Sequence, residues 1–260
     1  MPFPLAHPAA VLPFRCWCPG RLSFLALVVG SVTPDVAYCS GPLKLAKLAH
    51  AWLGTFVFCL PAGWLLVLIC LGIREPLASL LPNPHRDALL RMCRRAREPF
   101  GMVTVSLLIG AGTHIFLDGF THREGWCTQR FDVLRARVPT VGGYEAPVYR
   151  ILWYALSLAG LVWLAWSYAR WLKGAASTAG VGRVPEKWRY GIWALMLALP
   201  YAAIVPFTIH LADDRPLVYG IHRFIHASVG VYLVVVSLLL MLLGFGLRLR
   251  GSERRRQRDA

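Results

Sequence analysis

The sequence predicts an all-α fold: a polytopic transmembrane helix bundle with about five full spans and a short N-terminal re-entrant or interfacial apolar segment. Of the 260 residues, 57% are hydrophobic and 16% charged, and the mean hydropathy is +0.52. A soluble domain of this length carries more charge and less apolar sequence. Ten tryptophans and nine tyrosines fit interfacial aromatic anchors. The lipid bilayer is therefore a predicted partner of this chain.

The first fifty residues contain an apolar run that is too short to cross a bilayer. Residues 1–21 are rich in proline and lack the basic and apolar regions of a cleavable signal peptide. The run from Leu22 to Val32 is largely apolar, but a spanning helix needs about 20 residues. We expect this run to be re-entrant, interfacial or packed against other helices.

Five longer apolar stretches follow, and each is long enough to span a membrane. They cover residues 51–72, 100–120, 151–171, 190–211 and 226–247. Pro61 predicts a kink in the first stretch, and Pro200 and Pro206 interrupt the fourth. We expect residues 1–247 to form a single integral-membrane domain, followed by a basic, solvated tail over residues 248–260.

The connections between the spans predict the orientation in the membrane. With the C-terminal tail inside, the inner segments 73–99, 173–190 and 248–260 hold sixteen Lys and Arg, and the outer segments hold ten. Because basic residues are enriched on the cytoplasmic side, the C-terminus is predicted to be cytoplasmic. The same topology accounts for the net charge of +15. The tail lacks interleaved aromatic residues, so no nucleic-acid partner is predicted.

Histidine and aspartate residues gather at one predicted face of the membrane. Positions four apart share a helix face, so His114, Asp118 and His122 form a polar stripe at the end of the second span. The alternating direction of the spans brings further residues to this face: His50, His210 and His226 at span ends, and Asp213, Asp214 and His222 in the adjoining loop. His7 and Asp35 join them if the first apolar run folds in from that side.

This cluster has two interpretations that stay open. Ionisable side chains in a membrane protein are costly unless they are paired or face water, so each is a candidate functional residue. Histidine with aspartate suits zinc, manganese or iron, and such a metal can activate water. Alternatively, single residues such as His50 hydrogen-bond at the interface, and Asp35 caps a helix.

Several motifs, taken in order, resemble a known family. They are MPFPLAHPAA at residues 1–10, GSVTPD at 30–35, His50, HIFLDGFTH at 114–122, and PVYR at 147–150. Together they resemble the bacterial membrane family catalogued as domain of unknown function 4184, over most of the chain to about residue 240. The resemblance implies a multi-pass protein of the bacterial inner membrane and carries no established activity.

A looser likeness concerns membrane proteins predicted to be metal-dependent hydrolases, and zinc-dependent phospholipase C enzymes. In those proteins an N-terminal His, a Pro-Asp turn, a second His and a His-x-x-x-Asp motif recur as metal ligands. The likeness implies a divalent metal, zinc, and these ligands in the present chain: His7, Asp35, His50, His114 and Asp118.

We therefore expect a metal-dependent hydrolase of a phosphoester or lipid-like substrate at the outer face of the membrane. In this hypothesis Asp118 and His122 are catalytic, and Arg123 and Arg223 bind an anionic substrate. The alternative is a non-enzymatic transport, proton-relay or assembly protein in which the same residues form a buried polar network.

Overall fold

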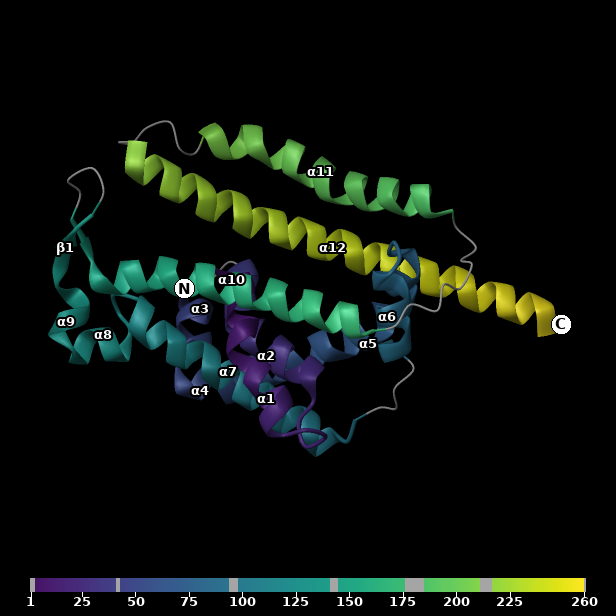
Figure 1. Ribbon diagram of the computed structural model, residues 1–260, viewed down its shortest axis with the longest axis horizontal. Helices are drawn as coiled ribbons and strands as arrows, with labels where there is room; N and C mark the ends of the chain where they lie inside the picture. Colours follow the sequence, from purple (N-terminus) through teal and green to yellow (C-terminus); the bar gives the residue numbers. More distant parts are fainter. Residues whose placement is uncertain are drawn as a thin grey trace. The chain divides into compact units, whose positions relative to one another are not determined.

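The computed structural model describes the backbone of residues 3–40, 43–93, 98–140, 145–175, 185–210 and 217–259. These residues are helical almost throughout, with one two-stranded antiparallel sheet (Figure 1). Five helical stretches are long and apolar enough to cross a membrane: Trp52–Leu80, Phe100–Arg130, Val148–Gly174, Glu186–Pro206 and Ser228–Gly251. A shorter apolar helix, Phe24–Val36, precedes them. The predicted all-α fold with five spans and one short segment is confirmed.

The chain divides into two compact units. The first comprises Met1–Leu68 and Ala96–Gly174, and the second comprises Ile69–Arg95 and Ala175–Ala260. One helix, α5 (Leu60–Leu80), begins in the first unit and ends in the second. The single membrane domain over residues 1–247 stays a prediction.

The N-terminal part of the first unit consists of short helices. In chain order these are the 3-10 helix η1 (Pro4–Val11), α1 (Leu12–Trp17), α2 (Phe24–Val36), the 3-10 helix η2 (Ala37–Ser40) and α3 (Leu43–Ala49). The hydroxyl of Ser23 caps α2 by accepting a hydrogen bond from the backbone N–H of Ala26, at 3.2 Å. This cap fixes where the short apolar run becomes helical.

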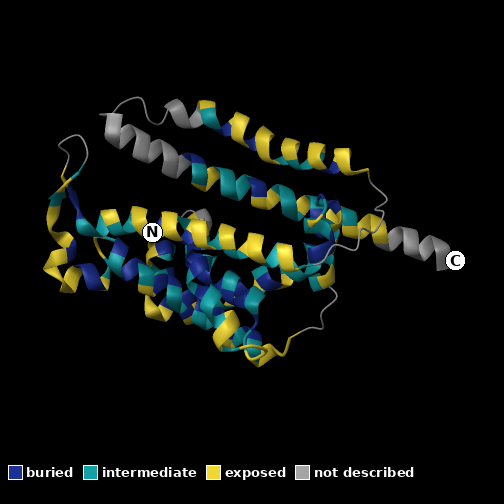
Figure 2. Cartoon of the chain, in the orientation of Figure 1, coloured by how far each residue is buried: buried dark blue, intermediate teal, exposed yellow. Residues whose placement is uncertain are grey.

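Helix α2 packs against α7 (Phe100–Thr121), which makes up most of the second span. A Cβ atom on Gly110 would lie 2.3 Å from the backbone oxygen of Leu27, and one on Gly30 would lie 2.3 Å from that of Leu107. The backbones therefore approach to a distance that only glycine allows. Buried residues concentrate along these two helices (Figure 2). Three placements were expected for the short apolar run from Leu22 to Val32. In the structure the run packs against another helix.

We predict that Gly110→Ala destabilises the protein by about 1–3 kcal/mol, because the added methyl group overpacks the contact with α2. Gly112→Ala is the matched control on the same helix, since a Cβ there meets no atom within 4 Å. Alanine at that position should be neutral or mildly stabilising, because it has the higher helix propensity. Thermal unfolding of both variants in detergent measures the difference. Equal stability of the two variants would contradict the close packing of α2 on α7.

The first span departs from a regular α-helix at its start and is longer than expected. It consists of α4 (Trp52–Gly54), the π-helical turn η3 (Thr55–Cys59) and α5. Pro61 occupies the first turn of α5, directly after the π-helical turn. The predicted end at residue 72 is corrected to Leu80, because the helix continues through Arg74, Glu75 and Pro76 and ends before the Pro82-Asn83-Pro84 segment.

The polar connection over residues 123–149 contains short elements of its own. They are α8 (Trp126–Arg130), α9 (Asp132–Arg135) and the antiparallel strands β1 (Arg137–Pro139) and β2 (Glu145–Pro147), with Val138 opposite Ala146. The third span, α10 (Val148–Gly174), follows directly.

The second unit contains α6 (His85–Cys93), α11 (Glu186–His210) and α12 (Leu217–Asp259). Helices α11 and α12 lie side by side (Figure 1), and the Tyr232 hydroxyl donates to the backbone oxygen of Leu197 at 3.1 Å. The basic tail over residues 248–260 continues α12 as a helix to Asp259.

Candidate metal centre

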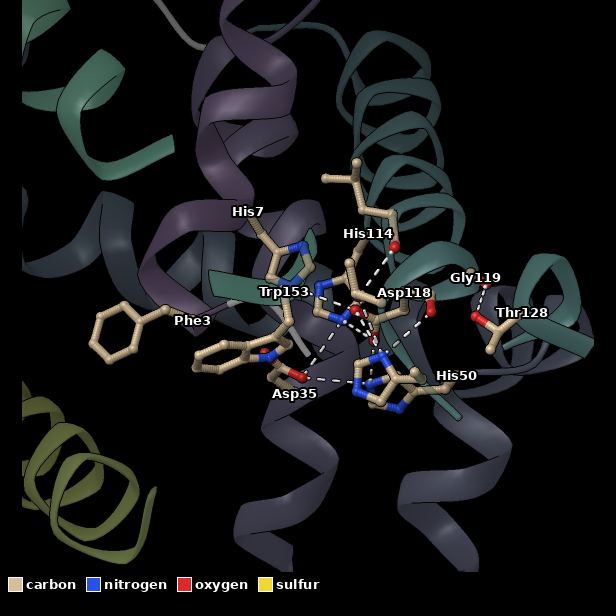
Figure 3. Close-up of polar contacts among 12 residues, drawn as sticks. Phe3, His7, Asp35, His50, His114, Asp118, Gly119, Thr128 and Trp153 are labelled. Atoms are coloured by element: carbon tan, nitrogen blue, oxygen red, sulfur yellow. Dashed lines mark hydrogen bonds and ion pairs between the residues drawn. The ribbon is translucent and has the colours of Figure 1, made fainter. Parts of the chain in front are cut away.

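Five histidine and aspartate side chains converge within the first unit (Figure 3). They come from four segments of the chain: His7 from η1, Asp35 from the last turn of α2, His50 from the turn after α3, and His114 and Asp118 from α7. His7, His114 and Asp118 are buried, and Asp35 and His50 are partly exposed. All five residues belong to the predicted ligand set.

In two of these histidines a backbone carbonyl determines that Nδ1 carries a proton. The Nδ1 atom of His114 lies 2.7 Å from the Ser31 oxygen, and the Nδ1 atom of His50 lies 2.8 Å from the Ala46 oxygen. Because a carbonyl oxygen only accepts, each Nδ1 donates its proton there. The Nε2 atom then carries a lone pair when the imidazole is neutral, and a second proton when the ring is charged. Both Nε2 atoms point into the cluster (Figure 3).

These Nε2 atoms face carboxylate oxygens at nearly equal distances. From His114 Nε2 the distance is 3.4 Å to Asp35 Oδ1 and 3.4 Å to Asp118 Oδ2. From His50 Nε2 the corresponding distances are 3.4 Å and 3.5 Å. A charge-assisted N–H···O bond is shorter, about 2.7–2.9 Å. Ligand atoms about 2.0–2.2 Å from a shared tetrahedral centre lie about 3.3–3.6 Å apart. The spacing is long for charge-assisted hydrogen bonds, and the ligand atoms of His50, His114 and Asp118 lie within 4.8 Å of one another, close enough to hold one ion.

His7 completes the cluster from the N-terminal segment. Its ring stacks on that of His114, with 3.7 Å between centroids and 17° between planes. Its Nε2 atom lies 3.7 Å from Asp118 Oδ1. Neither of its ring nitrogens makes a hydrogen bond among the described residues, although the side chain is buried. Burial and the neighbouring His114 lower the pKa of His7 to about 3, so near neutral pH its ring is neutral and can act as a ligand.

Helix α10 holds the segment that carries His7. The backbone N–H of Phe3 donates to the Ser157 hydroxyl at 2.8 Å, and a Cβ atom on Gly160 would lie 3.1 Å from the Cβ of Ala6. The third span thus positions a ligand that the sequence places more than a hundred residues upstream of His114.

Asp35 is a carboxylate in this environment. Burial alone would raise the pKa of Asp35, but the imidazoles of His114 and His50 hold it well below its ordinary value. The Tyr38 ring lies 5.3 Å from the His50 ring, and burial with the charges of Asp35 and Asp118 raises the pKa of Tyr38. Tyr38 was not among the predicted site residues. Its position three residues after Asp35 in a helical segment could have indicated it.

His122 lies at the edge of the cluster. It caps the C-terminus of α7, and its Nδ1 atom lies 3.6 Å from Asp118 Oδ1 and 3.2 Å from the backbone oxygen of Asp118. Its side chain is one-third exposed. Arg123 follows on the exposed surface. The remaining predicted residues lie outside the described part of the chain, in whole or in their side chains: His210, Asp213, Asp214, His222, Arg223 and His226.

The fold and this cluster define a polytopic, membrane-type helical protein with a buried histidine–aspartate site. The chain belongs to the family described as Domain of unknown function (DUF4184), whose model matches residues 1–245. The resemblance read from the ordered motifs is therefore confirmed. Neither a curated protein nor a solved structure matches the chain, so the likeness to metal-dependent hydrolases and zinc-dependent phospholipase C gains no support from these comparisons.

Proposed function

We propose that this protein is a metal-dependent hydrolase of a phosphoester or lipid-like substrate, acting at the outer face of the bacterial inner membrane with its C-terminus in the cytoplasm. One observation carries the proposal: the Nε2 atoms of His50 and His114 face the oxygens of Asp35 and Asp118 at 3.4–3.5 Å. Ligand atoms of one zinc-like ion would lie about this far apart.

The chemistry of the donors selects the cation. Two imidazole nitrogens and two carboxylate oxygens suit a borderline divalent ion, with zinc preferred over calcium or magnesium. Asp35 and Asp118 contribute two negative charges, which one divalent ion neutralises. When bound, such an ion acts as a Lewis acid and supplies hydroxide near neutral pH. The ligand atoms are buried, and His50 has the most exposed side chain of the ligands, at 17%, so the substrate would approach from its side.

The other side chains of the site would transfer protons and bind the anionic group of the substrate. His122 is in contact with Asp118 and one-third exposed, which suits a general acid or base that exchanges protons with solvent. Asp118 would orient His122 while also binding the ion. Arg123, exposed and next in sequence, would bind an anionic group of the substrate, and Arg223 is proposed for the same role.

Hydrolysis assays on the zinc-loaded protein in detergent, with phosphomonoester, phosphodiester and phospholipid substrates, test the proposal. We expect His122→Gln to lower kcat by about 100-fold while the metal content is unchanged, because general acid–base catalysis contributes about 100- to 10,000-fold. His85→Gln, on α6 of the second unit, is the control and should hydrolyse at the wild-type rate.

Two results would overturn this function. One is the absence of hydrolysis of every ester by zinc-loaded protein. The other is a vesicle experiment in which the wild type carries an ion flux that His114→Ala abolishes, since a buried polar network in a transporter or proton relay behaves in that way.

A further inference from the structure

The two aspartates present more ligand atoms than one ion can use. All four carboxylate oxygens of Asp35 and Asp118 are buried, and none makes a hydrogen bond among the described residues. Asp35 Oδ1 and Asp118 Oδ2 would hold the ion proposed above, because these atoms face His50 and His114. Asp35 Oδ2 and Asp118 Oδ1 lie outside that set of four ligand atoms, and a buried carboxylate oxygen without a hydrogen bond is costly.

His7 faces one of these remaining oxygens. Its Nε2 atom approaches Asp118 Oδ1, at 3.7 Å, and not the Oδ2 atom that faces His50 and His114. Ligand atoms of His7 and Asp35 lie within 4.8 Å of each other in one group, and those of His50 and Asp118 do so in a second group. His114 belongs to both groups. Each group is compact enough for one ion, and Asp118 Oδ1 adjoins the first group through its contact with His7.

The number of donors leads to the same conclusion. A zinc ion bound by protein side chains is almost always four-coordinate. His50, His114 and one oxygen from each aspartate already complete four positions. His7 is 1% exposed and both of its ring nitrogens are without hydrogen bonds among the described residues, so this buried imidazole is left without a ligand position in a four-coordinate single-ion site.

We propose a second cation position, formed by His7 Nε2, Asp118 Oδ1 and Asp35 Oδ2, so that both aspartates bridge two divalent ions. This inference rests on the proposed function, because the first ion occupies the His50 and His114 side of the same carboxylates. Two-metal sites hold their ions about 3.5–4 Å apart and stabilise both the attacking and the leaving oxygen of a displacement.

The second ion also narrows the substrate class. Two divalent ions against two carboxylates give the site a net charge of about +2, counting the imidazoles as neutral. A dianionic phosphate monoester neutralises that charge, whereas an uncharged carboxylic ester does not. The two-ion site therefore favours phosphoesters over lipid carboxylic esters.

Cobalt(II) titration of the purified full-length protein, followed by elemental analysis and electron paramagnetic resonance, tests the second position. We expect two Co²⁺ per chain in the wild type, with an exchange-coupled signal because carboxylates bridge the ions. His7→Gln should retain one Co²⁺ with an uncoupled signal, and the retained ion with unchanged thermal unfolding shows that this variant is folded. His85→Gln is the matched control and should bind two coupled ions.

One Co²⁺ in the wild type would overturn the second position and leave the proposed hydrolase intact. Two uncoupled ions, or two ions retained by His7→Gln, would also overturn it, because the second ion would then lie elsewhere. Binding of no ion by the wild type would overturn both the second position and the proposed function. The two failures are therefore distinguishable by stoichiometry alone.

Discussion

Replacing Asp118 by asparagine is expected to abolish stoichiometric metal binding. The carboxylate is the most connected group of the site, since its oxygens lie 3.4–3.7 Å from the nitrogens of His7, His50, His114 and His122. Asparagine keeps the shape but loses the charge and places an N–H₂ donor where a cation would bind. Changes outside the ligand shell already cost about 10- to 100-fold in metal affinity, so loss of this ligand should cost at least about 100-fold.

Elemental analysis of the purified protein measures this effect, with Asp132→Asn as the control. The Asp132 carboxylate is exposed and pairs with Arg135 in α9, so the control removes the same charge without touching the cluster. The control should retain the wild-type metal content. Equal metal content in Asp118→Asn and the wild type would refute the metal centre.

Removing the metal with a chelator is expected to lower the melting temperature by about 10 °C. Without a cation, two buried carboxylates lose the charge that would compensate them, and an unpaired buried charge is strongly destabilising. A ligand present at about 1,000 times its Kd stabilises the folded state by about 4 kcal/mol, and for a chain of this size each kcal/mol corresponds to about 2–4 °C. Adding back excess zinc should restore the original Tm.

The same thermal experiment on Asp118→Asn separates this effect from general damage by the chelator. The variant should melt at one temperature with or without chelator, because it binds no ion that could be removed. A chelator-induced decrease of equal size in the variant would contradict the site, as would a wild-type Tm that does not respond.

The spans and one part of the site could be predicted from local sequence. A bilayer requires long apolar segments with internally satisfied backbone groups, so hydropathy alone located all five. The spacing of His114 and Asp118 likewise placed both on one helix face, because 3.6 residues form a turn. The end of the first span at Leu80 was missed, since the basic residue Arg74 lies inside a helix that continues to the proline-rich stop.

Other parts of the site depend on contacts between residues far apart in the sequence. The motifs suggested His7, Asp35 and His50 as partners of α7, but no periodicity relates residues in η1, α2 and the turn after α3. Tyr38 joins them only because η2 turns its ring toward His50. The sequence also could not predict which ring nitrogen of His114 faces the cluster. The Nδ1 atom is held by the carbonyl of Ser31, which belongs to another helix.

The sequence by itself determined a helical membrane protein of this family, with one histidine–aspartate pair on a spanning helix. Hydropathy and helix periodicity are local properties, and neighbouring residues suffice to define them. Only the tertiary structure decided that four segments meet around Asp118. That outcome depends on close packing at Gly30 and Gly110, which brings α2 against α7, and on the hydrogen bond from Phe3 to Ser157, which holds His7 in place.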